Sequence, residues 1–217
     1  MPVKHIFNLH CKKCKRLARF LQDVKSKHPD YLCQPVAAFG DPDAQLLIVG
    51  LAPGMHGANA TGRPFTGDHS GILLYQTLYK YGFSSAASSE SAEDGLELLN
   101  CRITNAVKCL PPQNKPLADE IKTCLSYLAA ELTQLADNAV IVALGSIAHQ
   151  AVLKALGLRI KDYKFRHQAE FELNIKATRL HLISSYHCSR YNTQTKRLTE
   201  TMFHQVFCRA RQILNHV

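Results

Sequence analysis

The sequence contains no long hydrophobic run. No apolar stretch among its 217 residues approaches the roughly 18 to 20 residues that a membrane-spanning helix needs. The opening segment MPVKHIFNLHCKKCKRL also lacks the continuous apolar core of a signal peptide. We therefore expect a cytoplasmic protein with no membrane association.

Two common nucleotide-binding motifs are also missing. The glycine-rich stretch 46–71, LLIVGLAPGMHGANATGRPFTGDHSG, has no G-x-G-x-x-G, and no G-x-x-x-x-G-K is followed by Ser or Thr. Their absence weighs against dinucleotide binding and nucleotide hydrolysis. There is no obvious interdomain linker, and 217 residues of which 46% are hydrophobic can bury a full core. We expect a single domain over residues 1–217.

Acidic residues are scarce relative to basic ones. Seventeen Asp and Glu stand against 26 Lys and Arg, which gives a formal net charge of +9. Such an excess favours a polyanionic partner, although an unspecialised basic enzyme could have the same composition.

Apolar runs typical of strands alternate with segments of helical periodicity. The predicted strands lie within 44–51, 101–109, 138–145 and 178–187, and the predicted helices within 71–82, 116–135, 146–157 and 196–214. This alternation predicts an α/β fold, a three-layer sandwich with a central, mainly parallel four-stranded sheet flanked by helices. The basic segment 159–174 could form a hairpin. Ligands of such sheets bind beyond the carboxyl ends of the strands.

Four of the eight cysteines could share one site. Cys11 and Cys14 form a C-x-x-C pair, and Cys109 and Cys124 follow at the second strand and on the next helix. Four thiolates suit either tetrahedral zinc or a 4Fe-4S cluster. Unrelated structural cysteines are the alternative, and a redox dithiol is disfavoured because no thioredoxin-like context surrounds the pair.

Polar and aromatic groups are expected to meet on the strand-end rim. Phe65 and Asp68 belong to the glycine-rich run, Asn105 follows an apolar strand, and His187 ends the last strand. Exposed backbone beside a ring suits a planar ligand, and an amide offers a donor and an acceptor to a heterocycle edge. Each group alone has an ordinary structural explanation, in turn formation or local hydrogen bonding, so their convergence carries the hypothesis.

These residues resemble the iron-sulfur uracil-DNA glycosylases, and among them the type B, or fifth-family, enzymes. The resemblance runs from CKKC through GLAPG and GRPFTGD to ITNAVKCLPP and YHCSRYNTQTKRLT. It implies a central parallel sheet flanked by helices and a 4Fe-4S cluster that ties down the N-terminal segment. The implied cluster ligands are Cys11, Cys14, Cys109 and Cys124.

The resemblance also implies roles for the rim residues. Asp68 would direct water or charge at the sugar, and His187 would donate to the leaving base. Phe65 would stack on the flipped base and Asn105 would read its edge. The remaining substrate contacts would come from Gly50, Ala52, Pro53 and Gly54, and the DNA contacts from Ser189, Arg190, Asn192, Lys196 and Arg197. Leu51 stands where related enzymes carry a polar or acidic residue, and Cys188 replaces a proline after the histidine.

The expected function is a monofunctional DNA-repair glycosylase, a monomer by default, that leaves an abasic site. Its partner would be DNA containing uracil, hypoxanthine, xanthine or other deaminated bases. A noncatalytic nucleic-acid-binding protein with a structural zinc or iron-sulfur site would also explain the charge and the thiols, but would leave Asp68, Asn105 and His187 without a task. An electron-transfer iron-sulfur protein ranks last, because it needs no base pocket.

Overall fold

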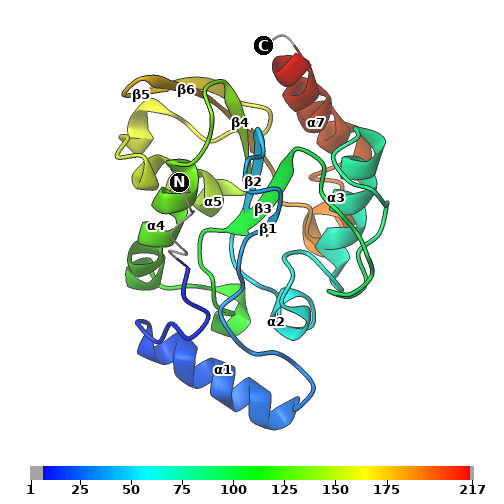
Figure 1. The fold of residues 1–217 in the computed structure, drawn as a ribbon, viewed down its shortest axis with the longest axis vertical. Coiled ribbons are helices and arrows are strands. Elements are labelled where there is room, and N and C mark those ends of the chain that lie inside the picture. Colours follow the sequence, from blue (N-terminus) through cyan, green and yellow to red (C-terminus); the bar gives the residue numbers. More distant parts are fainter. Residues whose placement is uncertain (1–6, 216–217) are drawn as a thin grey trace.

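A computed structural model describes residues 7–215 of the protein (Figure 1). Its centre is a six-stranded sheet with the order β1-β3-β2-β4-β6-β5. The strands are β1 (Phe39–Gly40), β2 (Leu46–Gly50), β3 (Cys101–Asn105), β4 (Ala139–Leu144), β5 (Glu170–Ile175) and β6 (Thr178–Ser185). β3, β2, β4 and β6 run parallel, whereas β1 and β5 add antiparallel edges.

The predicted α/β architecture and its four parallel strands are confirmed, but the expected strand count of four was too low. β1 is only two residues long, too short for a periodic signal. β5 overlaps the end of the basic segment 159–174 and extends one residue beyond it. It forms an antiparallel hairpin with β6. The second predicted strand is shorter than expected, since β3 ends at Asn105 and Cys109 lies in the buried segment after it.

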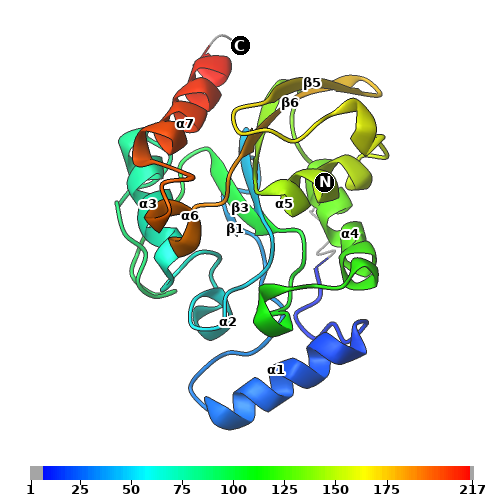
Figure 2. The ribbon, with the colours of Figure 1, turned by 180° about the vertical axis from the view of Figure 1, so that it is seen from behind.

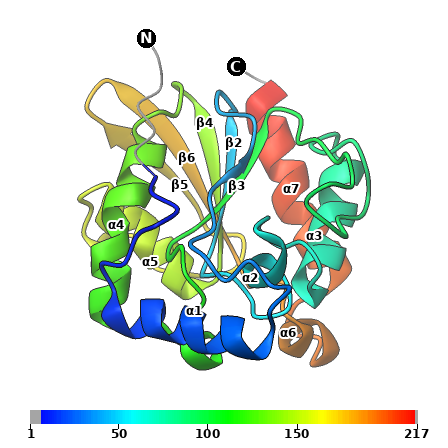
Figure 3. The ribbon, with the colours of Figure 1, turned by 60° about the horizontal axis from the view of Figure 1, so that its bottom comes forward.

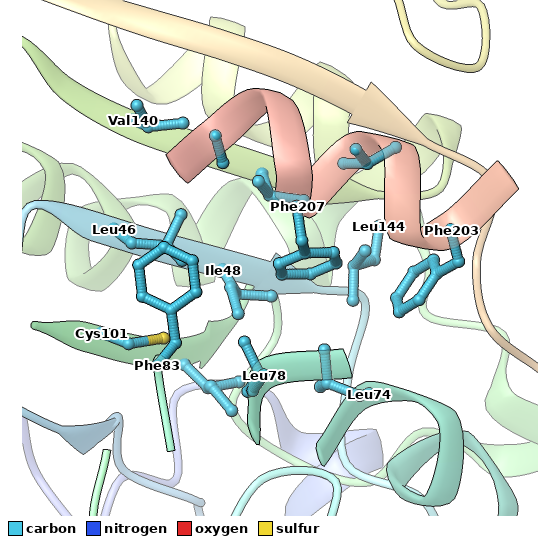
Figure 4. Packing of buried hydrophobic residues seen from close by; sticks show 14 of the residues in the cluster. Leu46, Ile48, Leu74, Leu78, Phe83, Cys101, Val140, Leu144, Phe203 and Phe207 are labelled. Atoms are coloured by element: carbon cyan, nitrogen blue, oxygen red, sulfur yellow. The ribbon is translucent and has the colours of Figure 1, made fainter. Parts of the chain in front are cut away.

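Helices cover both faces of the sheet (Figures 1 and 2). α3 (His69–Lys80) and α7 (Glu200–Asn215) pack on one face, and α4 (Ala118–Leu132) and α5 (Ser146–Ala155) on the other. In Figure 4, Phe203 and Phe207 of α7 pack over Ile48 of β2 and Leu144 of β4, and all four side chains are buried. The three layers thus follow from sheet residues that are apolar on both faces.

Four further elements gather at the carboxyl end of the parallel strands. They are α1 (Lys15–Lys27), α2 (Ala58–Thr61), α6 (Arg190–Gln194) and the 3₁₀ turn η1 (Pro112–Asn114); a second turn, η2 (Ile160–Asp162), follows α5. Figure 3 shows α1 lying across this end of the molecule. The prediction missed α1, although Leu17, Leu21 and Val24 have helical spacing and form its buried face.

Within residues 7–215, the structure contains no helix with the length and apolar character needed to cross a bilayer.

Candidate active site

A cavity of about 630 Å³ opens at the carboxyl end of the sheet. Its wall includes Phe65, Asp68, Asn105 and His187, the four residues that the sequence predicted to converge. Among the other predicted site residues, Ala52, Gly54, Ser189 and Arg190 also line it. A volume of this size falls within the range of small-molecule sites in proteins.

The floor of the cavity depends on the missing side chain of Gly50, the last residue of β2. A Cβ built at Gly50 would collide with Asn105 Oδ1 and would lie 2.9 Å from the ring of Phe65. Both neighbours are buried, at 3% and 6% exposure. Asn105 Oδ1 has no hydrogen-bond partner among the described residues, and a buried polar atom without a partner is costly unless a ligand satisfies it. Glycine therefore allows the ring and the amide to meet at the strand end.

Asp68 is the N-cap of α3, and its Oδ1 accepts a hydrogen bond from the Gly71 backbone N–H at 2.9 Å. Its other oxygen faces two glycines: a Cβ at Gly57 would lie 2.7 Å from Oδ2, and one at Gly54 3.2 Å from it. Burial raises the pKa of Asp68, and the backbone N–H groups of Gly71 and Ser70 partly offset the rise. The carboxylate is thus fixed at one oxygen while the other lies on the cavity side.

His187 follows β6, and its ring stacks near that of Phe65, with centroids 6.0 Å apart and planes 27° apart. The Asn192 side-chain amide holds its backbone by donating to the His187 carbonyl at 2.8 Å. Burial of the imidazole lowers the pKa of His187 to about 4. The ring is therefore neutral at physiological pH, a form in which one nitrogen still carries a hydrogen to donate.

An ion pair between the buried Arg63 and the more exposed Asp94 fixes the loop that carries Phe65 and Asp68. The Arg63 guanidinium lies 2.5 Å from Asp94, donates to Ser89 Oγ at 3.1 Å, and stacks 4.4 Å from the Phe39 ring centroid. Burial alone would raise the pKa of Asp94, but Arg63 and three backbone N–H groups lower it to about 2. These contacts hold a segment in which Phe65 itself adopts a left-handed backbone with φ of 57°.

The residues after His187 divide between internal and surface positions. Ser189 Oγ caps α6 by accepting from the Asn192 N–H. Arg197 lies 4.9 Å over the Tyr186 ring and lines, with Asn192, a smaller cavity of about 240 Å³. This second cavity shares Leu51 and His187 with the first. Lys196 is exposed and lines neither, and Pro53 is buried beside the main cavity without lining it.

All four cysteines that were predicted to share a site line one enclosed pocket. Cys11 and Cys14 precede α1, Cys109 follows β3, and Cys124 lies on α4. Burial and then the neighbouring cysteines raise the pKa of Cys109 to about 12, so the sulfur atoms lie within one electrostatic neighbourhood. Cys124 Sγ also accepts from the Lys108 N–H at 3.4 Å. In residues 7–215 no three His, Cys, Asp or Glu side chains converge on a single ion position.

Sequence reasoning missed two exposed residues, one on the cavity wall and one that follows the lining residue Arg190 in the sequence. Tyr191 on α6 is 70% exposed, an unusual position for a large aromatic side chain. His56 lines the cavity and is hydrogen-bonded to Tyr31. The signal for Tyr191 was present, because an aromatic residue sits among polar ones in YHCSRYNTQTKRLT. The contact between Tyr31 and His56 left no trace in residue spacing.

The fold places helices on both faces of a mainly parallel sheet. An acid, an amide and an imidazole meet at the strand ends, which is the arrangement of an active site in an α/β protein. Residues 37–211 match the family profile described as the Uracil DNA glycosylase superfamily. The chain belongs to this superfamily.

Named relatives refine the comparison. The chain is 44% identical over 208 residues to the type-5 uracil-DNA glycosylase of Thermus thermophilus, covering 94% of this chain and 93% of that protein. It is 39% identical to the type-5 enzyme of Pyrobaculum aerophilum, with 93% and 88% covered. A crystal structure of Pedobacter heparinus SMUG2 has a TM-score of 0.50 at 15% identity, covering 81% of this chain and 77% of that one. This last likeness concerns the fold alone.

The low pKa of His187 predicts a pH-dependent stability. The folded protein holds this imidazole neutral down to about pH 4, whereas a histidine in an unfolded chain has a pKa of about 6.5. Between these values the unfolded chain binds more protons, so the contribution to stability is present above the upper value and is lost as pH falls through the window. Urea unfolding of the wild type and His187→Gln from pH 4.5 to 7 should show the steeper acid loss in the wild type. Equal slopes would contradict the shift, and NMR titration of the His187 ring provides an independent check.

Proposed function

We propose that this protein is a DNA-repair glycosylase that extrudes uracil from DNA and hydrolyses its N-glycosidic bond. The observation that carries the proposal is the meeting of Phe65, Asp68, Asn105 and His187 in one cavity. Membership of the superfamily and extended similarity to type-5 uracil-DNA glycosylases support it.

Recognition of an extruded base has to replace the stacking and pairing that the base loses, which cost a few kcal/mol. The Phe65 ring at the cavity wall supplies an aromatic surface. The Asn105 amide supplies a donor and an acceptor, one of which has no partner within the described chain. A pyrimidine edge with adjacent carbonyl and N–H groups complements such an amide.

The cleavage itself separates charge. As the bond between sugar and base lengthens, positive character grows on the sugar and negative charge on the base, and water finally adds to the anomeric carbon. Asp68 places a carboxylate where it can stabilise the sugar or orient that water, and neutral His187 can donate an N–H to a base carbonyl. The two groups then stabilise opposite ends of one transition state.

The reaction ends at an abasic site. A lyase step would need an amine to attack the sugar, and among the described residues that line the cavity there is no lysine. This composition supports a monofunctional glycosylase.

The cysteine site would hold a 4Fe-4S cluster. In such a cluster four cysteine thiolates serve as ligands, so the ligands need not converge on a single ion. The four cysteines come from three segments, and their common pocket is otherwise lined by Lys13, Leu17, Pro35, Lys108, Thr123 and Tyr127. When bound, the cluster would supply a structural cross-link between the N-terminal segment and α4.

A broader range of bases, including hypoxanthine and xanthine, is consistent with the apolar Leu51 on the cavity wall. A hydrocarbon wall imposes no hydrogen-bonding requirement, so it discriminates weakly between bases of different polarity.

The charged residues beyond His187 would contact the DNA backbone. Arg190 lies at the cavity mouth and Lys196 is exposed. Beside them, the protruding Tyr191 ring could occupy the space that an extruded base leaves in the stack.

The first prediction from the proposed function concerns Asp68. Asp68→Asn should slow single-turnover cleavage of a uracil-containing strand by on the order of a hundredfold or more, because the neutral amide removes the charge near the sugar. Asparagine is also a good N-cap, so α3 should persist. The control Asp119→Asn alters an exposed acid at the start of α4 and should cleave normally. Cleavage by Asp68→Asn at the wild-type rate would exclude the proposed role.

The second prediction concerns the cofactor. Protein purified without oxygen should contain about four irons per chain, and Cys109→Ser should lower the iron content and the stability together. Cys101→Ser, at a buried cysteine outside the pocket, should retain the iron. Stoichiometric zinc without iron would instead favour a zinc site and reopen the noncatalytic alternative.

The third prediction concerns DNA binding. Arg190→Glu combined with Lys196→Glu should weaken binding to damaged and undamaged DNA alike. The dependence of binding on salt should also become shallower, because a protein with fewer phosphate contacts releases fewer counterions when it binds. Lys161→Glu, a reversal in η2, is the charge-matched control for Arg190→Glu and for Lys196→Glu, each also made alone. A loss confined to damaged DNA would assign the pair to base recognition instead.

A further inference from the structure

A cluster of three rings, His28, Tyr31 and His56, lies at the edge of the cavity and has no role in the proposed chemistry. Tyr31 Oη lies 2.8 Å from His56 Nδ1. The His28 and Tyr31 rings stack with centroids 4.6 Å apart and planes 14° apart. The His56 ring stands nearly perpendicular to both, at 81° and 83°, with centroids 5.9 Å away in each case. His56 is therefore held in one orientation although it is exposed to solvent.

The hydrogen bond to Tyr31 also determines what His56 can offer to a ligand. A phenol hydroxyl is a far better proton donor than a neutral imidazole N–H, and an imidazole nitrogen is the better acceptor. With the phenol donating to Nδ1, the neutral ring carries its hydrogen on Nε2. A protonated ring carries one there as well. In both states Nε2–H is a donor with a fixed direction.

The position of His56 favours a phosphate as its partner. The groups suited to a base, Phe65 and Asn105, are buried at the floor of the cavity. His56 lines the same cavity but is exposed. An extruded base stays joined to the backbone through its sugar, so a base on the floor brings neighbouring phosphates to the exposed rim.

We propose that His56 is a DNA-contacting residue whose Nε2–H donates to a phosphate oxygen of the strand that carries the extruded nucleotide. Tyr31 and His28 are positioning residues that orient this donor. The assignment rests on the proposed function, because it takes a flipped nucleotide as the occupant of the cavity.

The test measures binding rather than cleavage. The probe is a DNA duplex with one 2′-fluorodeoxyuridine, whose electron-withdrawing fluorine resists loss of the base, and with methylphosphonate replacing one phosphate at a time around it. His56→Ala should weaken binding of the unmodified probe about threefold to tenfold, as expected for one exposed hydrogen bond. At one linkage the methylphosphonate should weaken binding by the wild type but not by His56→Ala, because the variant already lacks the contact with that phosphate.

Four further variants, two tests and two controls, separate positioning from general structure. Tyr31→Phe keeps the stacked ring but removes the hydroxyl, so it should give a smaller loss at the same linkage. His56→Gln replaces Nε2 with an amide donor and should restore part of the binding, which also covers failure of the alanine variant to fold. Tyr79→Phe and His181→Ala, on α3 and β6, are matched controls and should bind as the wild type does.

Three results would overturn the proposal. The first is that His56→Ala loses the same binding as the wild type at every modified linkage, and the second is that His56→Ala binds as the wild type does. A changed preference among bases without a linkage-specific effect would also reject it, since His56 would then read the base. Cleavage of ordinary deoxyuridine by the wild type tests the proposed function separately, so a failure there is distinguishable from a failure of the phosphate contact.

Discussion

The pairing of Arg63 with Asp94 holds together the two loops on which the cavity depends. Arg63 is 6% exposed, whereas Asp94 lies nearer the surface. Loss of Asp94 would leave the buried guanidinium without its charged partner, which is destabilising. The pair joins the segment 84–95 to the glycine-rich run, and Arg63 also donates to the Ala92 carbonyl at 2.5 Å. Between these anchors Phe65 keeps a backbone conformation that non-glycine residues rarely adopt. The aromatic wall of the cavity thus depends on a charge pair that does not itself line the cavity.

The cavity and the cysteine site are built on one continuous piece of chain. β3 ends at Asn105, and Cys109 follows within the same buried segment. Between them Lys108 is 1% exposed and binds both Glu131 oxygens at 2.8 Å, while its ammonium also donates to Thr104. The Val36 N–H donates to the Lys108 carbonyl at 2.7 Å. A displacement at the thiols would therefore be transmitted to the amide that faces the cavity.

Periodicity and residue type were enough to predict the layers of the fold and much of the rim. The runs at 46–50 and 139–144 are apolar throughout, so they could be placed as central strands, and strand ends of a parallel sheet meet at one edge. α1 was not predicted, because its few apolar residues stand among many charged ones directly after the C-x-x-C pair. The Arg63 pair and the ring cluster could not be inferred, because each joins segments that are distant in sequence through side-chain geometry alone. Ser189 and Asn192 were expected to contact DNA, and that prediction still stands, but both side chains also have internal hydrogen bonds that spacing does not reveal.

The Cys188 thiol donates to the Ser70 carbonyl at 3.4 Å, which links the residue after His187 to the first turn of the helix that Asp68 caps. This contact ties the segment that carries the imidazole to the helix that the acid caps, so the spacing between Asp68 and His187 is restrained. Under the proposed chemistry, a purine and a pyrimidine present glycosidic bonds at different distances from their outer edges. Because the spacing between Asp68 and His187 is restrained, the difference in size between the two kinds of base has to be accommodated at the apolar cavity wall around Leu51. Substrate breadth would then depend on how readily that wall repacks, while the catalytic spacing stays constant.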